Sequence, residues 1–336
     1  PADLSKLGSM YIGESQRTIT QDGLASCGTT MVPAGSIVLS TRAPIGSLAI
    51  AATPLCTNQG CKSLVPQKVN SKCFAYLLSV CTEALNVRGK GTTFLELSGD
   101  ELGAFRVPVP SGKEQELIGA FLDRETAKID ALVEEQQRLI ELLKEKRQAV
   151  ISQAVTKGLD PNVPMKDSGV EWLGEVPAHW SILALSRVAT SWCDGPFGSG
   201  IKSDHYTESG ALVVRLQNIR SSGFYVGEPA YLDQGYFMDS LSRHAVLDGD
   251  VLIAGLGDEN NLVGRACVAP PDIGMALVKA DCFRFRMNQD VAMPAFVALQ
   301  LNAGAACDGG RMATGSTRSR IPLGAMASRR IALPPI

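Results

Sequence analysis

The sequence predicts a mixed α/β fold in which two modules of α+β type are joined by one long, coiled-coil-like helix. Residues 91–110 and 315–334 share one pattern of glycine, threonine, apolar residues and a closing proline, at a constant offset of 224 positions. Residues 113–157 lie between the two copies and contain no proline and a single glycine. Short apolar runs separated by glycine and proline fill the rest, which is typical of strands and turns.

The repeated segment is the strongest evidence for two modules. Its matched pairs include Gly91 with Gly315, Thr93 with Thr317, Leu97 with Ile321, Val107 with Ile331, and Pro110 with Pro334. Earlier in each module, VPAGSIVLS (32–40) and LDGDVLIAG (247–255) occupy similar positions. Recurrence of one supersecondary pattern indicates duplication, and two modules on a spacer suit a target with two separated sites.

Length and composition limit the class of protein. A chain of 336 residues favours two domains. No stretch has the roughly 18 consecutive apolar residues of a membrane helix, and the N-terminus lacks a secretory signal. The nine cysteines form no CxxC pair, so we expect buried, reduced cysteines in a cytoplasmic protein without a metal site. A net charge of −2 excludes a globally basic protein, but residues 311–330 hold five arginines and no acid.

Local patterns predict the elements of the first module. The sequence Pro33-Ala34-Gly35 forms a turn before an apolar strand at 36–40, and a second apolar run covers 48–52. The longer apolar segment CFAYLLSVC (73–81) is long enough for a helix.

Residues 113–157 predict a helix that packs against another helix. Its stripe advances by alternating steps of three and four positions, which is the heptad spacing of coiled coils. The packing positions are Ile129, Leu132, Gln136, Leu139, Leu143 and Val150. Ser111 with Glu114 has the spacing of a capping box, and Gly158 is suited to end the helix.

Several segments resemble the DNA-specificity subunits of type I restriction–modification systems. The specific matches are VPVPSGKEQELIGAFLDRETAKIDALVEEQQRLIELLKEKRQAVISQAVTKGLD, which contains the long helix, and the connector MKDSGVEWLGEVPAHW. Looser matches are PFGSGIKSDHYTESGALVVRLQNI (196–219), STRAPIGSLAI (40–50) and CTNQGCKSLVP (56–66). The resemblance covers essentially the whole chain.

The resemblance implies a domain plan. Residues 1–110 would form a first target-recognition domain whose opening part is missing, and 111–158 the conserved spacer helix. Residues 159–336 would form the connector and a second target-recognition domain, with the following helix missing. Because the family pairs two such helices antiparallel, we expect this chain, truncated at both ends, to expose an apolar stripe and to self-associate.

The resemblance also implies a function. The chain would be a non-catalytic subunit that recognises a bipartite target in double-stranded DNA, with no cofactor and no metal of its own. Methyltransferase subunits would dock on it and supply S-adenosylmethionine, and a restriction subunit would bring ATP and Mg²⁺. In agreement, His179, His205 and His244 are scattered, and the sequence contains no HExxH pair, Walker loop or GxSxG elbow. The segment Asp258-Glu259-Asn260-Asn261 suits a solvated or base-contacting loop better than a metal site.

Polar loops supply the candidate DNA contacts, because arginine and lysine bind guanine and phosphate while asparagine and glutamine bind adenine. In the first module the candidates are Arg42, Lys62, Arg88, Lys90, Thr92 and Thr93. In the second they are Lys202, Ser203, His205, Arg215, Gln217, Asn218, Arg220, Arg311, Thr314, Ser316, Thr317, Arg318 and Arg320. The loops GKGTT and GSTRSR recur at equivalent positions but differ in charge, as two different half-sites would require.

Two alternatives stay open at this point. The chain is also compatible with the recognition segment of a fused, single-chain restriction–methyltransferase. A coiled-coil scaffold without DNA binding is a third possibility, although it leaves the paired polar loops unexplained.

Overall fold

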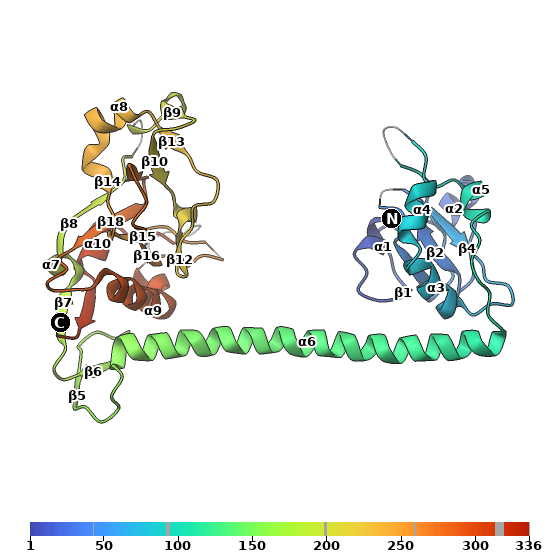
Figure 1. Cartoon of the computed structure of the whole chain (residues 1–336), viewed down its shortest axis with the longest axis horizontal. Coiled ribbons are helices and arrows are strands. Elements are labelled where there is room, and N and C mark those ends of the chain that lie inside the picture. Colours follow the sequence, from blue (N-terminus) through green and yellow to red (C-terminus); the bar gives the residue numbers. More distant parts are fainter. Residues whose placement is uncertain (43, 92–94, 198–199, 259, 313–318, 336) are drawn as a thin grey trace. The chain divides into compact units, whose positions relative to one another are not determined.

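The computed structural model describes residues 1–42, 44–91, 95–197, 200–258, 260–312 and 319–335, and it confirms the predicted mixed α/β class with a long helix. The chain divides into two compact units, Pro1–Arg138 (unit 1) and Leu139–Ile336 (unit 2). Each unit contains part of the long helix α6, Gly112–Lys157, which runs without interruption (Figure 1).

Unit 1 is built on a four-stranded sheet with the order β1-β3-β2-β4. The central strand β2 pairs antiparallel with both β3 and β4, and β1 pairs parallel with β3. The strands are β1 (Tyr11–Ile12), β2 (Ile37–Ser40), β3 (Leu48–Ala51) and β4 (Cys61–Leu64). The helices outside α6 are α1 (Ala2–Ser5), α2 (Gln21–Ser26), α3 (Ser71–Ser79), α4 (Thr82–Arg88) and α5 (Gly99–Gly103). The predicted strands at 36–40 and 48–52 and the predicted helix at 73–81 are therefore confirmed.

Both faces of this sheet are buried, because alternate residues of β2 enter different clusters. Ile37 packs with Ile50 and the α3 residue Phe74, whereas Val38 packs with Ala49 and Ile12 on the opposite face. All four residues of β2 are buried. Full burial of one such aliphatic side chain stabilises a fold by about 1.5–3 kcal/mol, so β2 is the core of the unit.

Unit 2 contains two larger sheets. The first has the order β14-β17-β10-β13-β9 and the second the order β16-β15-β18-β8. The strands of the first are β9 (Tyr206–Thr207), β10 (Ala211–Val214), β13 (Tyr231–Leu232), β14 (Ala245–Val246) and β17 (Ala276–Val278). Those of the second are β8 (Ala189–Asp194), β15 (Val251–Ala254), β16 (Ala266–Val268) and β18 (Cys282–Met287).

Short elements complete unit 2. Three two-stranded pairs combine β5 (Met165–Asp167) with β6 (Glu175–Pro177), β7 (Ser181–Ala184) with β19 (Arg330–Leu333), and β11 (Ile219–Arg220) with β12 (Gly223–Phe224). The α-helices are α7 (Leu185–Val188), α8 (Gln234–Tyr236), α9 (Pro294–Met312) and α10 (Leu323–Ser328). The other helical turns are η2 (Ser203–His205), η3 (Leu216–Asn218), η4 (Phe237–Leu241) and η5 (Ser242–His244).

Strand β15 joins the two sheets of unit 2 through the alternation of its side chains. Val251 and Ile253 face a cluster that includes the α9 residue Leu301. Leu252 and Ala254 face a second cluster, which also contains Val214 of β10 and Val278 of β17. The core of unit 2 therefore continues from α9 through one sheet to the other.

The sequence repeat is also a repeat of backbone structure. In unit 1, Gly35 has φ +85° before β2, and in unit 2 Gly249 has φ +77° before β15. After the central strand, the Leu97 amide donates to the Thr41 carbonyl at 2.8 Å. The same bond recurs between the Ile321 amide and the Gly255 carbonyl, also at 2.8 Å. Each glycine-led loop thus ends beside the segment that follows the central strand of its own unit.

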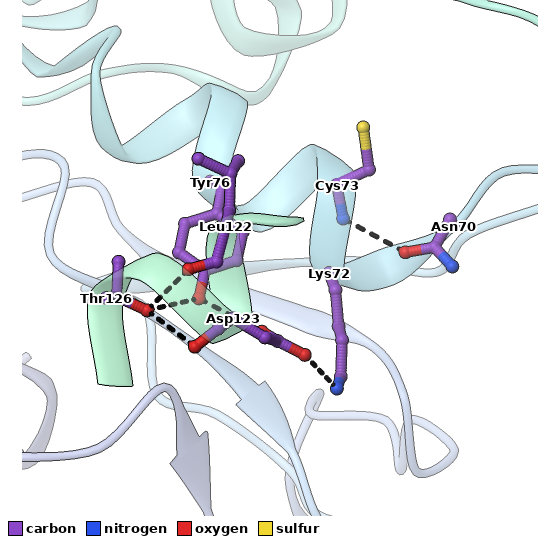
Figure 2. Close-up of polar contacts among 7 residues, drawn as sticks. All are labelled: Asn70, Lys72, Cys73, Tyr76, Leu122, Asp123 and Thr126. Atoms are coloured by element: carbon purple, nitrogen blue, oxygen red, sulfur yellow. Dashed lines mark hydrogen bonds and ion pairs between the residues drawn. The ribbon is translucent and has the colours of Figure 1, made fainter. Parts of the chain in front are cut away.

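A polar cluster fixes the first third of α6 to α3 within unit 1. Figure 2 shows Lys72 and Tyr76 of α3 directed at Asp123 and Thr126 of α6. Lys72 Nζ lies 2.5 Å from Asp123 Oδ2, and the Tyr76 hydroxyl donates to Asp123 Oδ1 at 3.0 Å. The hydrogen bond from Lys72 holds the pKa of the Asp123 carboxyl below its usual range.

The ends of α6 are also specified by side chains. The Ser111 amide donates to Glu114 Oε2 at 2.8 Å, which confirms the predicted capping box. Gly158 has φ +78°, as predicted for a glycine that ends a helix. Within unit 2, the side-chain nitrogen of Gln300 donates to the Val155 carbonyl and, at 2.8 Å, to the Ala332 carbonyl. The side-chain oxygen of Gln300 accepts from the Ala332 amide at 2.8 Å.

The cysteines correct one expectation. All nine are free, but Cys27 and Cys307 are exposed and Cys56, Cys81 and Cys193 are only half-buried. Cys27 follows the small helix α2, which has no buried residue, so the local apolar core is too thin to cover it. In the described part of the chain, no helix combines the length and apolar character needed to cross a membrane.

The contact between α3 and α6 gives a first prediction. Replacing Asp123→Asn removes the ionic partner of Lys72, and we expect the first turns of α6 to exchange amide hydrogens about two- to fivefold faster. This corresponds to about 0.5–1 kcal/mol, the range for partly exposed ion pairs. Because the pKa of Asp123 is depressed in the folded state, the wild-type protection should be present above pH 3.8 and decline as the pH falls below it.

The matched control is Asp130→Asn, which changes an exposed carboxylate on the same helix. Hydrogen exchange measured by mass spectrometry resolves residues 112–126 in both variants. Equal exchange rates in the two variants would show that Asp123 does not hold α6 against unit 1.

Candidate nucleic-acid interface

A cleft of about 860 Å³ opens on unit 2 and is lined mainly by polar and cationic residues. Its cationic lining residues are Arg215, Arg220, Lys279 and the deeply placed Arg265. Asp258 is the acidic residue among the described lining, so the positive charges exceed the negative ones. A concave surface with excess positive charge concentrates its field on anionic ligands.

The pairing of two strands places two of these cations, Arg215 and Lys279, side by side. β10 and β17 are parallel neighbours, with Val214 opposite Val278, and the Lys279 amide donates to the Val214 carbonyl at 2.9 Å. Arg215 directly follows β10 and Lys279 directly follows β17. Because parallel strands end at the same edge of a sheet, the two side chains emerge together.

Aromatic residues orient the cations at this edge. The guanidinium of Arg220 lies 3.4 Å from the ring centroid of Tyr225. Lys279 Nζ bonds the hydroxyl of Tyr206 at 3.1 Å. Arg215 bonds the Glu228 carbonyl through Nη2, while its buried Nε has no hydrogen-bond partner within the described ranges.

Two loops bring side-chain amides to the same cleft. Gln217 of η3 lines one side, and Asn260 and Asn261 line the other. Asp258 shapes the second loop, since Oδ1 accepts from the Asn260 amide at 2.9 Å and from Asn261 Nδ2 at 3.0 Å. These hydrogen bonds lower the pKa of the Asp258 carboxyl, and the bond from the Asn261 side chain contributes most. Gln217 and Asn260 are exposed and make no side-chain hydrogen bond to any residue that the structure describes.

Unit 1 carries a smaller polar site around the loop GKGTT. Arg42 pairs with Glu96 at 3.2 Å, and Lys90 pairs with Glu101 at 2.6 Å. Arg88 lies 4.0 Å from Glu101 and its guanidinium covers the ring of Phe105. Exposed pairs of this kind contribute only about 0.2–1 kcal/mol, so a stronger anionic partner can replace the carboxylates.

Comparison with known proteins shows which proteins parts of this chain resemble. Residues 6–142 match the model of the type I restriction modification DNA specificity domain. The chain is also 37% identical over 146 residues to the type I restriction enzyme MjaIX specificity subunit of Methanocaldococcus jannaschii. Over part of its length the chain is therefore similar to the specificity subunits of type I restriction–modification systems. The MjaIX match covers 43% of this chain and 33% of the relative.

A second specificity subunit and two solved structures extend the comparison. The EcoBI specificity subunit of Escherichia coli is 23% identical over 248 residues, which are 72% of this chain and 51% of the relative. The chain thus spans a third to a half of the length of these curated relatives. A chain from a structure of a type I R-M system matches 91% of this chain and 72% of its own length, with a TM-score of 0.56 and 16% identity. The HsdS subunit from Thermoanaerobacter tengcongensis matches 91% of this chain and 70% of its own, with a TM-score of 0.50 and 16% identity.

The structure brings some of the predicted site residues together and separates others. Arg215, Gln217 and Arg220 line the cleft. Asn218 lies beside them but is 1% exposed, and its Nδ2 donates to the Tyr225 and Val226 carbonyls. Lys202 and Ser203, at η2, are exposed outside the cleft lining, and His205 stacks on Tyr236.

The remaining candidates lie elsewhere in the two units or outside the described residues. In unit 1, Lys62 lies in β4 and is half-buried, while Arg42, Arg88 and Lys90 form the ion pairs described above. In unit 2, Arg320 pairs with Asp281 at 2.7 Å and covers the ring of Phe197. Thr92, Thr93, Thr314, Ser316, Thr317 and Arg318 lie outside the described residues, as does the side chain of Arg311.

Two residues of the cleft were missed by sequence reasoning. The signal for Lys279 is present, because ALVK (276–279) and ALVVR (211–215) each place a cation directly after an apolar strand. Arg265 has no such signal, since its role depends on contacts between distant loops. No group of three or more potential metal ligands occurs in the described part of the chain.

A partly buried carboxyl interacts with the charges of Asp281 and Arg320. Asp194 ends β8 and accepts a hydrogen bond from the Gly195 amide at 2.7 Å. Burial, with a smaller contribution from the charge of Asp281, raises the pKa of Asp194 to about 6. The folded state therefore favours the protonated carboxyl, whereas the unfolded chain titrates near 3.8.

This shift predicts a pH dependence of stability. The contribution of Asp194 to folding is fully present below pH 3.8 and is lost as the pH rises through about 6. Asp194→Asn removes the charge, so we expect unit 2 to become about 1–2 kcal/mol more stable at neutral pH and unchanged near pH 4, after allowance for partial solvent exposure. All three tryptophans (172, 180 and 192) lie in unit 2, so urea unfolding followed by tryptophan fluorescence measures this unit alone. The exposed Asp248→Asn is the control, and an equal gain there would contradict the assignment to Asp194.

Proposed function

We propose that this chain is the DNA-recognition subunit of a type I restriction–modification complex. Each unit contacts one half of a bipartite target in double-stranded DNA. The observation that carries the proposal is the cleft of unit 2, where cations and free side-chain amides share one surface. In unit 1 the cations Arg42, Arg88 and Lys90 supply the second contact.

The chemistry of the cleft suits the two kinds of contact that DNA recognition requires. Arg220 and Lys279 are cations at the edge of the cleft, where phosphates approach, and phosphate contacts fix the position of a protein on the duplex. Gln217 and Asn260 offer a donor and an acceptor each, which is the pattern that pairs with adenine in the major groove. Arg215 supplies a further cation whose buried Nε lacks a partner in the described part of the chain.

Helix α6 supports the proposal as spacer and as docking surface. Its 46 residues would extend about 69 Å at a rise of about 1.5 Å per residue. The packing residues Ile129, Leu132, Leu139, Leu143 and Val150 are between 46% and 59% exposed, and Gln136 is exposed as well. Because isolated apolar stripes of this length are costly in water, the stripe fits a partner helix.

We propose that the chain is not catalytic and acts with partner subunits. Methyltransferase subunits would supply S-adenosylmethionine, and a restriction subunit would supply ATP and Mg²⁺ chemistry. The curated relatives described above are themselves specificity subunits, and the comparisons do not support the fused-enzyme alternative.

The DNA contact is tested by removing one cleft cation. We expect Lys279→Met to weaken binding of the full chain to a fluorescein-labelled duplex of mixed sequence by about three- to tenfold near 0.1 M salt. The slope of log Kd against log salt concentration should fall by about one, because one phosphate contact is lost. Fluorescence anisotropy titrations between about 50 and about 200 mM salt measure both quantities.

Lys144→Met is the matched control, since Lys144 is an exposed lysine of α6 that pairs with Glu141. A wild-type chain whose DNA affinity did not depend on salt would contradict the proposal and favour the scaffold alternative. Mapping methylated adenines in DNA from cells that carry the complete system then tests the bipartite target, which a continuous motif would exclude.

The apolar stripe gives a separate prediction. We expect the wild-type chain to self-associate at micromolar concentration and the double variant Leu139→Gln, Leu143→Gln to shift toward monomer by at least tenfold in dissociation constant. Burial of a leucine contributes about 1.5–3 kcal/mol, which is sufficient for that change. Sedimentation velocity measures the mass distribution, with the polar exchange Glu135→Gln as control. A stable wild-type monomer would contradict the expected helix partner.

A further inference from the structure

One buried arginine connects the two loops of the cleft. Arg265 directly precedes β16 and is 7% exposed. Nε donates to the Ile219 carbonyl and Nη2 to the Leu216 carbonyl, both at 2.8 Å. Nη1 donates to the Leu256 carbonyl at 3.1 Å and to the Leu262 carbonyl at 3.0 Å.

These four bonds divide evenly between two segments. Two acceptors, Leu216 and Ile219, belong to the turn that carries Gln217 and Arg220. The other two, Leu256 and Leu262, flank the loop that carries Asn260 and Asn261. The guanidinium is planar and presents its donors in fixed directions, so it sets the spacing and orientation of both segments together.

Burying the charge of the Arg265 guanidinium costs free energy of folding. Burial lowers the pKa of Arg265, and among the described residues its hydrogen-bond acceptors are carbonyl oxygens, not carboxylates. A buried guanidinium without an ion pair is costly unless its N–H groups are satisfied by acceptors. Packing alone would be served by an apolar residue, so the directional bonds to the two loops account for an arginine at this position.

We propose that Arg265 is the positioning residue for base discrimination by unit 2. Arg265 holds the turn 215–222 and the loop 258–262 at a fixed spacing and orientation. It thereby fixes the side-chain amides of Gln217 and Asn260 relative to the cations that contact phosphate. This inference rests on the proposed function. It separates two properties of the cleft, because affinity for DNA depends on the exposed cations while discrimination between bases depends on Arg265.

The test is the substitution Arg265→Lys, which keeps the charge but presents three donors from a single atom and cannot reach four separated carbonyls. A duplex bearing the bipartite site is first selected by the full wild-type chain from a random library. The dissociation constants of both proteins are then measured for that duplex, for single-base variants of each half-site, and for a duplex of mixed sequence.

We expect Arg265→Lys to lose about tenfold in discrimination at one half-site, the range that one well-placed side-chain contact to a base provides. Discrimination at the other half-site and affinity for the mixed-sequence duplex should change less than twofold. The unaffected half-site is an internal control for folding and for concentration of active protein. Loss of affinity for all duplexes alike, or unchanged discrimination at both half-sites, would overturn the proposal.

A second pair of variants tests the same idea without altering a buried residue. Asp258→Ala removes the bonds that shape the loop 258–262, whereas Asp258→Asn keeps an oxygen acceptor for the Asn260 amide. We expect Asp258→Ala alone to reduce discrimination at the half-site that Arg265→Lys affects. Equal loss of discrimination in both Asp258 variants would show that charge rather than loop geometry matters, and unchanged discrimination in both would show that the shape of this loop does not matter; either result would overturn the inference. If the wild-type chain selects no bipartite site, the proposed function fails first, and that result is separate from either variant.

Discussion

The candidate interface depends on the parallel pairing of β10 with β17. This pairing brings two strands that are distant in sequence to the same edge of a sheet, and each is followed at once by a cation. Without it, Arg215 and Lys279 would leave the core at unrelated places, and the turn that carries Gln217 would have no cationic neighbour. The buried cluster of Val214, Leu252 and Val278 stabilises that edge from below. The polar chemistry of the cleft therefore depends on an apolar contact between two sheets.

The two units use one backbone plan with different side chains. The bond between Leu97 and Thr41 in unit 1 matches the bond between Ile321 and Gly255 in unit 2. At the neighbouring position, however, Glu96 in unit 1 pairs with Arg42, whereas Arg320 in unit 2 pairs with Asp281. The backbone bond is thus retained while the charge at this neighbouring position is reversed.

Features governed by neighbouring residues could be predicted from the sequence. The bounds of α6, its capping box at Ser111 and its glycine stop at Gly158 all follow from local preferences, and the structure confirms them. The sequence also indicated Arg215 and Gln217 as candidates. It could not show that Asn218 is buried, because that depends on the hairpin that folds over it. The role of Arg265 could not be predicted for the same reason, since its four acceptors come from loops that meet only in the folded chain.

The bonds made by Arg265 have a consequence for how recognition can diversify. All four of its acceptors are backbone carbonyls, and the bonds that anchor the glycine-led loops also join backbone atoms. A carbonyl is the same whichever side chain its residue carries, so exposed positions such as 217 and 260 can change identity without loss of these bonds. Under the proposed function, new target preferences can therefore arise by single substitutions on an unchanged framework. The exposed side chains that can be substituted are therefore distinct from the groups that hold the loops in place.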